Sequence, residues 1–288
     1  MTRAKPPLPP GVPPLVAGSV LFHAGAAVTF AADWETWPWV LAALAANHAV
    51  MTVACVSPRN GLLGPAIARL PAAACDRGEV ALTFDDGPDA DGTPKVLDIL
   101  DRYRATASFF CIGSRSARDP GLVREIAARG HFVENHTFRH RYNFAFHLPG
   151  GLAAEIGRAQ DLLTELTGRA PVFFRPPVGI RAPLLQPALW RFGLSLVTWT
   201  RRGYDGLPAN PDTVLARLRH GLTAGDILVL HDGGPSGGHA AVQTLPRLLG
   251  TIEDRGLRAV SLTHAFAPAI ASAAAETVAF GKSPLASA

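Results

Sequence analysis

Two adjacent carboxylates, Asp85 and Asp86, follow an apolar run and precede a Gly-Pro turn in the segment TFDDGP at 83–88. On a turn, neighbouring carboxylates can serve different purposes, because one can bind a cation while the other takes a proton from water. An Asp-Gly turn closed by an Asx hydrogen bond has the same sequence. The pair therefore needs further residues before it indicates a catalytic site.

Two histidines provide such residues. His136 and His140 are four positions apart in HTFRH, a spacing that places both on one face of a helical turn, where they can bind one metal ion. With Asp86 they make two histidines and one carboxylate with open coordination positions, the pattern of a catalytic metal site. Water on such a metal is acidic enough to attack a carbonyl near neutral pH. Solvated or capping histidines are the alternative.

Arg175 and His231 each follow another apolar run. His231 directly follows the run 227–230 and can serve as a general acid, although a lone histidine is more often structural. Arg175 opens the segment RPPVG, whose prolines stiffen the loop and can hold a backbone N–H, such as that of Val178, toward an oxyanion. A surface ion pair is the alternative role for Arg175.

A repeating scaffold must bring these residues together. β-favouring apolar runs alternate with helical patterns from residue 79 onward. The runs are 80–84, 107–112, 131–134, 172–174, 194–199, 227–230 and 257–262. The helical patterns are 93–103, 121–128, 152–166, 182–191, 211–222 and 240–255. This alternation predicts an α/β fold, a distorted (β/α) barrel of about seven parallel strands.

The candidate residues all lie at the carboxyl ends of these predicted strands. Asp205 joins them, in the loop after the fifth run. Active sites of α/β barrels are built at this face. The order of the motifs along the chain therefore predicts one shared catalytic site.

In these motifs the chain resembles the polysaccharide deacetylases, a carbohydrate esterase family with the NodB homology domain. The resemblance covers residues 75–265 and rests on four segments: TFDDGP at 83–88, HTFRH at 136–140, FRPPVG at 174–179 and ILVLH at 227–231. It implies hydrolysis of N-acyl groups, mostly acetyl, from amino sugars.

The same resemblance implies a metal cofactor and a general base. Asp86, His136 and His140 would bind a divalent metal, which is usually zinc in this family. Asp85 would be the base that activates water.

The resemblance also implies roles for residues around that base. Arg175 would orient Asp85, and Asp205 would brace Arg175. His231 would be the acid that protonates the leaving amine. Leu230 would line the pocket for the acyl methyl group.

Three positions depart from the family pattern. In the fourth motif Arg202 stands at the first Asp position and Gly206 at the Trp position, and Val178 replaces an aromatic residue in the third. The loss of two aromatic walls makes a long glycan polymer a poorer fit. Extra arginines near the site would suit an anionic substrate such as a phosphate-linked sugar.

The amino-terminal part of the chain is apolar. Residues 6–32 and 36–58 contain no Asp, Glu, Lys or Arg, and two apolar helices are expected at 15–32 and 37–56. A membrane-spanning helix needs about 20 mostly apolar residues, so these helices are predicted to form a membrane hairpin. A pair of buried helices and a cleavable signal peptide are the alternatives.

The chain is thus expected to have three parts: a membrane hairpin with its linker over 1–70, a deacetylase domain over 71–266 and an Ala-rich tail over 267–288. Basic residues flank the hairpin, and acidic residues lie between its helices. The basic residues are Arg3, Lys5, Arg59 and Arg69, and the acidic ones are Asp33 and Glu35. By the positive-inside rule the catalytic domain is expected on the cytoplasmic side of the inner membrane.

Composition excludes several other classes of protein. Charged residues are 17% and hydrophobic residues 48%, which excludes a wholly disordered chain. The 28 Gly and 25 Pro show no three-residue period, so the chain is not collagen-like. A net charge of +4 without a basic run argues against nucleic-acid binding. Three separated cysteines form neither a disulfide framework nor a metal pair.

The sequence therefore predicts a membrane-bound, metal-dependent hydrolase that removes an N-acyl group, first of all acetyl, from an amino sugar of a polysaccharide or a lipid-linked saccharide. A cytoplasmic body suits a lipid-linked or nucleotide-linked sugar, and an outward body suits peptidoglycan or an exopolysaccharide. Alternatives are a non-catalytic carbohydrate-binding membrane protein, a deformylase of a lipid-linked amino sugar and a cyclic-amide hydrolase. The sugar, the metal and the oligomeric state stay open.

Overall fold

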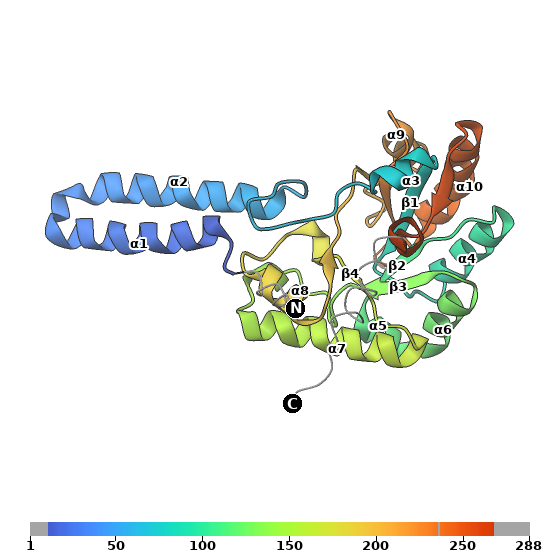
Figure 1. Ribbon diagram of the computed structural model, residues 1–288, viewed down its shortest axis with the longest axis horizontal. Helices are drawn as coiled ribbons and strands as arrows, with labels where there is room; N and C mark the ends of the chain where they lie inside the picture. Colours follow the sequence, from blue (N-terminus) through green and yellow to red (C-terminus); the bar gives the residue numbers. More distant parts are fainter. Residues whose placement is uncertain (1–10, 236, 268–288) are drawn as a thin grey trace, which may run out of the picture.

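Two antiparallel helices project from the body of the molecule. The computed structural model describes residues 11–235 and 237–267. α1 (Pro14–Ala32) and α2 (Trp37–Val56) are joined by the 3-10 helix η1 (Trp34–Thr36) and extend away from the rest of the chain (Figure 1). Both helices lie within one residue of the predicted ranges. The predicted Ala-rich tail lies, apart from residue 267, outside the described residues.

Almost all the apolar surface of this hairpin is exposed. In α1 the buried residue is Val16, and in α2 it is Ala54. Each helix carries an apolar window of 18 residues, of which 6% is buried. Length and composition alone therefore allow both helices to cross a membrane.

The body contains one parallel sheet in the order β5-β4-β3-β2-β1-β7-β6, with β8 paired to the first half of β1. Its strands are β1 (Glu79–Asp85), β2 (Ser108–Cys111), β3 (Phe132–Asn135), β4 (Phe173–Phe174), β5 (Ser195–Leu196), β6 (Arg201–Arg202), β7 (Ile227–His231) and β8 (Arg258–Val260). The predicted α/β fold is confirmed, and the barrel is a curled half-barrel. All seven predicted strands are present, and the two-residue β6 is an addition.

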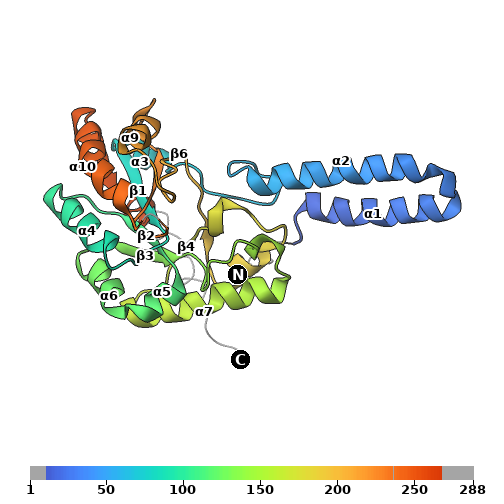
Figure 2. The same cartoon turned by 180° about the vertical axis from the view of Figure 1, so that it is seen from behind.

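Helices cover the outer face of this sheet and connect its strands (Figure 2). They are α3 (Ala72–Asp76), α4 (Gly92–Arg102), α5 (Gly113–Arg118), α6 (Pro120–Ala128), α7 (Pro149–Thr167), α8 (Leu185–Arg191), α9 (Pro211–Arg219) and α10 (His239–Asp254), with the 3-10 turns η2 (Phe144–Phe146) and η3 (Pro177–Gly179). Side-chain caps fix where two of them begin. Asp119 accepts from the N–H of Leu122 at the start of α6, and Asn210 caps α9 in the same way.

The core lies on both faces of β1, all of whose residues are buried. On the outer face Leu82 and Phe84 pack among the helices, whereas Ala81 and Phe110 pack on the inner face. Successive side chains of a strand point to opposite faces, so one apolar run serves both cores. The run stops at Asp85, where the strand reaches the carboxyl edge of the sheet.

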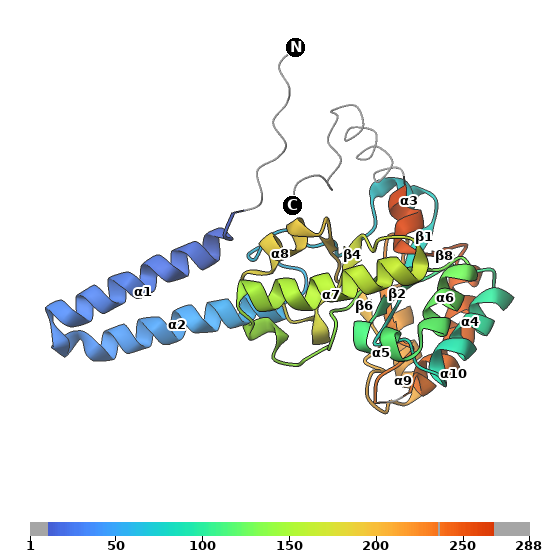
Figure 3. The ribbon, with the colours of Figure 1, turned by 90° about the horizontal axis from the view of Figure 1, so that it is seen from below.

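The hairpin is tied to the body beside α8 (Figure 3). The buried Arg181 donates from Nη1 to the carbonyl oxygen of Asn60 at 2.6 Å and from Nη2 to that of Gly64 at 2.7 Å. Arg59 donates to the carbonyl oxygens of Trp199 and Thr200. The linker after α2 therefore contacts two loops of the body.

Candidate active site

Three potential metal ligands converge at the carboxyl edge of the sheet. Oδ1 of Asp86 lies 3.4 Å from Nε2 of His136 and 3.1 Å from Nε2 of His140. One ligand atom from each residue lies within 4.8 Å of the others. Metal–ligand bonds of about 2 Å bring ligand atoms to separations of this size, so the donor set fits a divalent metal.

The two histidines meet in a loop and not on a helical turn, which corrects one expectation. β3 ends at Asn135, and the segment through His140 is non-helical. Thr137 (φ 64°) and His140 (φ 52°) are left-handed, a backbone conformation that costs free energy and clusters at functional sites. Asn135 Oδ1 accepts from the N–H of Thr137, and Thr137 Oγ1 accepts from the N–H of His140. These side chains hold the bend.

Hydrogen bonding prepares His136 to act as a ligand. Its Nδ1 lies 2.7 Å from the carbonyl oxygen of Arg175 and donates to it, which fixes the ring and turns Nε2 toward Asp86. Burial, followed by the charge of His136, lowers the pKa of His140 to about 4, which leaves that ring neutral. Burial alone would raise the pKa of Asp86, but the hydrogen bond and charge of His136 lower it. Asp86 and His140 are therefore in the forms that bind metal.

A buried arginine fixes the second carboxylate. Arg175 donates from Nη1 to Asp85 Oδ1 at 2.5 Å and to Thr83 Oγ1 at 2.9 Å, and its Nη2 donates to the carbonyl oxygen of Thr198 at 3.1 Å. Burial would raise the pKa of Asp85, but the charges of Arg175 and then His136 lower it. Asp85 is therefore ionised and held in one orientation, as a general base must be.

Asp205 supports His231 and not Arg175, which is a second correction. Its Oδ1 lies 2.9 Å from Nδ1 of His231, and its Oδ2 accepts from the backbone N–H of His231 at 2.9 Å. Burial would lower the pKa of His231, but the hydrogen bond and charge of Asp205, with the charges of Asp85 and Asp86, raise it. His231 is consequently protonated at a higher pH than an ordinary histidine and can donate a proton.

With this geometry established, comparison with known proteins identifies the family. The family described as "Polysaccharide deacetylase" matches residues 73–197. A peptidoglycan-N-acetylglucosamine deacetylase of Bacillus cereus is 33% identical over 196 residues, which are 66% of this chain and 69% of that protein. The chain belongs to the polysaccharide deacetylase family. As its relatives are, it is a hydrolase that acts on carbon–nitrogen bonds other than peptide bonds.

Two further relatives agree with this assignment. A chitooligosaccharide deacetylase of Bradyrhizobium sp. is 35% identical to this deacetylase over 159 residues, which are 55% of this chain and 72% of that protein. The crystal structure of the Bc1960 peptidoglycan N-acetylglucosamine deacetylase superposes with a TM-score of 0.64 at 30% identity and covers 69% of this chain and 91% of that chain. The family acts on saccharides that contain N-acetylglucosamine.

The pocket of this deacetylase contains most of the predicted site residues. It is lined by Asp85, Asp86, His136, His140, Val178, Gly179, Trp199, Arg202 and His231. Arg175 and Asp205 lie behind this lining and touch Asp85 and His231. Trp199 is the pocket residue that the sequence analysis did not single out. It ends the fifth predicted strand, so the rule that selected the other residues would also have selected it.

Leu230 does not reach the pocket, which is a third correction. It is fully buried in the core between the sheet and its helices. Leu230 and His231 are neighbours in β7, and neighbouring side chains of a strand point to opposite faces. Because His231 points into the pocket, Leu230 points away from it.

The loop at Val178 is held in an unusual backbone conformation. Val178 is left-handed (φ 51°), which is a rare conformation for a β-branched residue. Gly179 follows, also left-handed (φ 80°), and a Cβ there would lie 2.2 Å from the Trp199 ring. A side chain at 179 would displace the indole from the pocket wall, so glycine is required.

A buried carboxylate, Asp232, supports the turn after Asp86 and was also missed. Thr93 Oγ1 donates to Asp232 Oδ2 at 2.5 Å, and a Cβ on Gly87 would lie 2.3 Å from the same oxygen. Burial raises the pKa of Asp232 to about 7. Only its position next to His231 in the sequence pointed to it.

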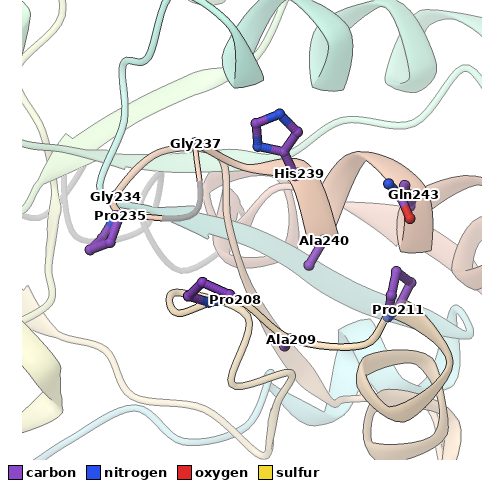
Figure 4. Close-up of a pocket in the computed structure, with 9 residues that line it drawn as sticks. All are labelled: Pro208, Ala209, Pro211, Gly234, Pro235, Gly237, His239, Ala240 and Gln243. Atoms are coloured by element: carbon purple, nitrogen blue, oxygen red, sulfur yellow. The ribbon is translucent and has the colours of Figure 1, made fainter.

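A larger hollow adjoins the site. Its volume is about 560 Å³, and Figure 4 shows the segments 208–211 and 234–243 facing each other across it. Gly234 lies between the two spaces, since it lines the hollow and a Cβ there would lie 3.1 Å from Asp86 Oδ2.

Proposed function

We propose that this member of the polysaccharide deacetylase family is a metal-dependent hydrolase that removes the N-acetyl group of an amino sugar. The observation that supports it best is the placement of Asp85 and His231 in one pocket with Asp86, His136 and His140. A base, an acid and three metal ligands are the groups that amide hydrolysis requires.

The residues of the chain divide the reaction among them. Asp86, His136 and His140 would hold a divalent metal, for which we propose zinc, and that metal would supply the Lewis acidity that makes water and an amide carbonyl more reactive. Asp85 accepts the proton of the attacking water. The backbone N–H of Val178 donates to the oxygen on which negative charge develops.

His231 completes the cycle by donating its proton to the nitrogen of the leaving amine. Asp205 holds the ring so that Nε2 faces the pocket, because Nδ1 is engaged with its carboxylate. Arg175 acts through Asp85, which it orients and keeps ionised. The products are acetate and a free amino sugar.

We further propose that the hairpin of α1 and α2 anchors the enzyme in the cytoplasmic membrane with the body on the cytoplasmic side. Two exposed apolar helices and the basic residues Arg59 and Arg69 beside the body support this arrangement. A lipid-linked or nucleotide-linked saccharide is then the substrate that such a body meets. A reporter fused to the carboxyl end of the full chain tests the side, and a signal only outside the cytoplasm would contradict it.

The activity is tested with the purified full chain in detergent. Acetate release from N-acetylated chitooligosaccharides and from a lipid-linked N-acetylglucosamine is the expected result, with formate release from an N-formylated amino sugar as the comparison. Formate without acetate would replace the proposal by the deformylase alternative. Neither product from any of these substrates, with metal bound, would favour the non-catalytic carbohydrate-binding alternative.

A further inference from the structure

One arginine stands inside the catalytic pocket without a carboxylate partner. Arg202 lines the pocket, and its guanidinium carbon lies 4.8 Å from the centroid of the Trp199 ring and 5.3 Å from that of Tyr204. Its Nη1 makes one long contact of 3.4 Å, to the carbonyl oxygen of Val178. Its Nε is buried and has no hydrogen-bond partner among the described residues.

A second arginine lies near the same tyrosine. Arg217 of α9 places its guanidinium carbon 5.4 Å from the ring centroid of Tyr204 and donates from Nη1 to the carbonyl oxygen of Gly203. Tyr204 is 61% exposed and left-handed (φ 59°), so its ring lies on the surface within 5.4 Å of both cations. We call Arg202, Tyr204 and Arg217 the arginine–tyrosine rim.

The charges of this rim are not neutralised, unlike those of neighbouring arginines. Arg175 pairs with Asp85 at 2.5 Å, and Arg201, next to Arg202, pairs with Asp226 at 2.5 Å. In the described part of the chain, no carboxylate oxygen lies within 4.0 Å of a guanidinium nitrogen of Arg202 or Arg217. A cation that is placed in a pocket and left unpaired is available for an anion that arrives with the substrate.

We propose that the arginine–tyrosine rim binds a phosphate carried by the N-acetylated amino sugar, so that Arg202 determines specificity for phosphate-linked over neutral saccharides. A guanidinium offers two parallel N–H donors to phosphate oxygens, and two guanidinium groups near one ring suit a group with several oxygens. The exposed ring of Tyr204 offers a face for the sugar. This inference rests on the proposed deacetylation.

The same phosphate can come from a soluble sugar phosphate or from a lipid-linked sugar. The linker after the hairpin contacts the wall of the catalytic pocket. Arg59 in this linker donates to the carbonyl oxygen of Trp199, whose ring lies against Arg202. The pocket wall is thus continuous with the part of the chain that is proposed to enter the membrane.

Three substrates separate these sources when acetate release is measured with the full chain in detergent. They are neutral tetra-N-acetylchitotetraose, N-acetylglucosamine 1-phosphate and polyprenyl-diphosphate-linked N-acetylglucosamine. For wild type we expect a higher kcat/KM for the phosphorylated sugars than for the neutral one. A preference of the lipid-linked form over N-acetylglucosamine 1-phosphate identifies a lipid as the source of the phosphate.

The decisive variant is Arg202→Gln. It is expected to lower the ratio of kcat/KM between phosphorylated and neutral substrate by about 10- to 100-fold, the value of one charged hydrogen-bonded contact. Arg202→Lys should retain part of the ratio, and Arg217→Gln should lower it less. The matched control is Arg124→Gln, which removes an exposed arginine on α6 and should leave the ratio unchanged.

An equal loss on all substrates in Arg202→Gln would show a structural role at the Val178 loop and would overturn the proposal, as would an unchanged ratio. Binding measured by calorimetry on Asp85→Asn makes the test independent of turnover. In that background Arg202→Gln should weaken binding of N-acetylglucosamine 1-phosphate at least tenfold. Tight, Arg202-dependent binding without acetate release from wild type would refute the deacetylation alone.

Discussion

The hairpin and the body of this deacetylase place their apolar residues in opposite ways. In α1 and α2, Val20, Leu21 and Val53 are each more than half exposed, whereas every residue of β1 is buried. Two polar side chains of the hairpin face inward instead of outward: Asn47 of α2 donates to Ser19 Oγ of α1. The body is stabilised by burying apolar surface against itself, and the hairpin exposes the surface that lipid would cover.

The body differs from the hairpin also in that it buries charged groups at its catalytic pocket. Four buried charges of the body, Asp85, Arg175, Asp205 and His231, meet at one pocket, whereas others such as Arg181 and Asp226 are buried elsewhere. Burying a charge is costly unless it is paired, so this concentration identifies the place where folding stability has been given up for chemistry.

The largest effect is expected from Asp85→Asn. Losing the base should lower kcat by about 10²- to 10⁴-fold, while Asp86, His136 and His140 still bind metal. Acetate release and metal content by mass spectrometry are measured on the same sample. A variant with full turnover would remove Asp85 from the role of base.

Next in size is the loss of stability in Arg175→Met. This change leaves Asp85 buried without its partner and should lower the free energy of unfolding by about 3–5 kcal/mol. Because the folded pKa of Asp85 is lowered, the ionised pair stabilises the fold above the ordinary carboxyl pKa near ~4. That contribution is lost as the pH falls through the lowered value. Denaturant titrations of wild type and variant should converge in acid, and equal stability at neutral pH would contradict the pairing.

A charge on the hairpin should act on the membrane and spare the chemistry. Val28→Arg places a cation on an exposed face of α1 and should disfavour insertion by about 2.5–3.5 kcal/mol. The matched control, Ala128→Arg, adds the same charge to an exposed position of α6. Carbonate extraction should release the first variant and retain the second. Equal retention of both would argue against α1 as a membrane helix.

A smaller effect is expected in the pH profile of Asp205→Asn. Asp205 raises the pKa of His231, so wild type keeps its acid protonated above the usual range of histidine and loses activity as the pH rises through the raised value. Removing the carboxylate should move this alkaline limb of kcat/KM to lower pH. An unmoved limb would mean that another group is the acid.

The sequence predicted most accurately what depends on apolar periodicity. β1 and β7 were expected almost residue for residue because both are wholly buried and mostly apolar before the last residue. β6 (Arg201–Arg202) was missed because it is polar and its pairing depends on the adjacent β7. The local sequence carries no information about such a short strand at the edge of the sheet.

The sequence predicted most of the residues that form the site, but it predicted their contacts with one another less well. Asp86, His136 and His140 were brought together as expected, because strands of one sheet present their ends at one edge. The partner of Asp205 was wrong because it depends on the path of a loop between β6 and α9, which no periodicity describes. Leu230 could have been excluded from the sequence, since it alternates with His231 along β7.

The most direct test of the central claim is a metal titration of the full chain in detergent. After chelation, stepwise addition of zinc is followed by acetate release from N-acetylated chitooligosaccharides. One equivalent should restore full activity in wild type, and His136→Ala should recover none at that concentration because it lacks one of three ligands. Activity that survives chelation, or an equal recovery in His136→Ala, would contradict a metal site formed by Asp86, His136 and His140.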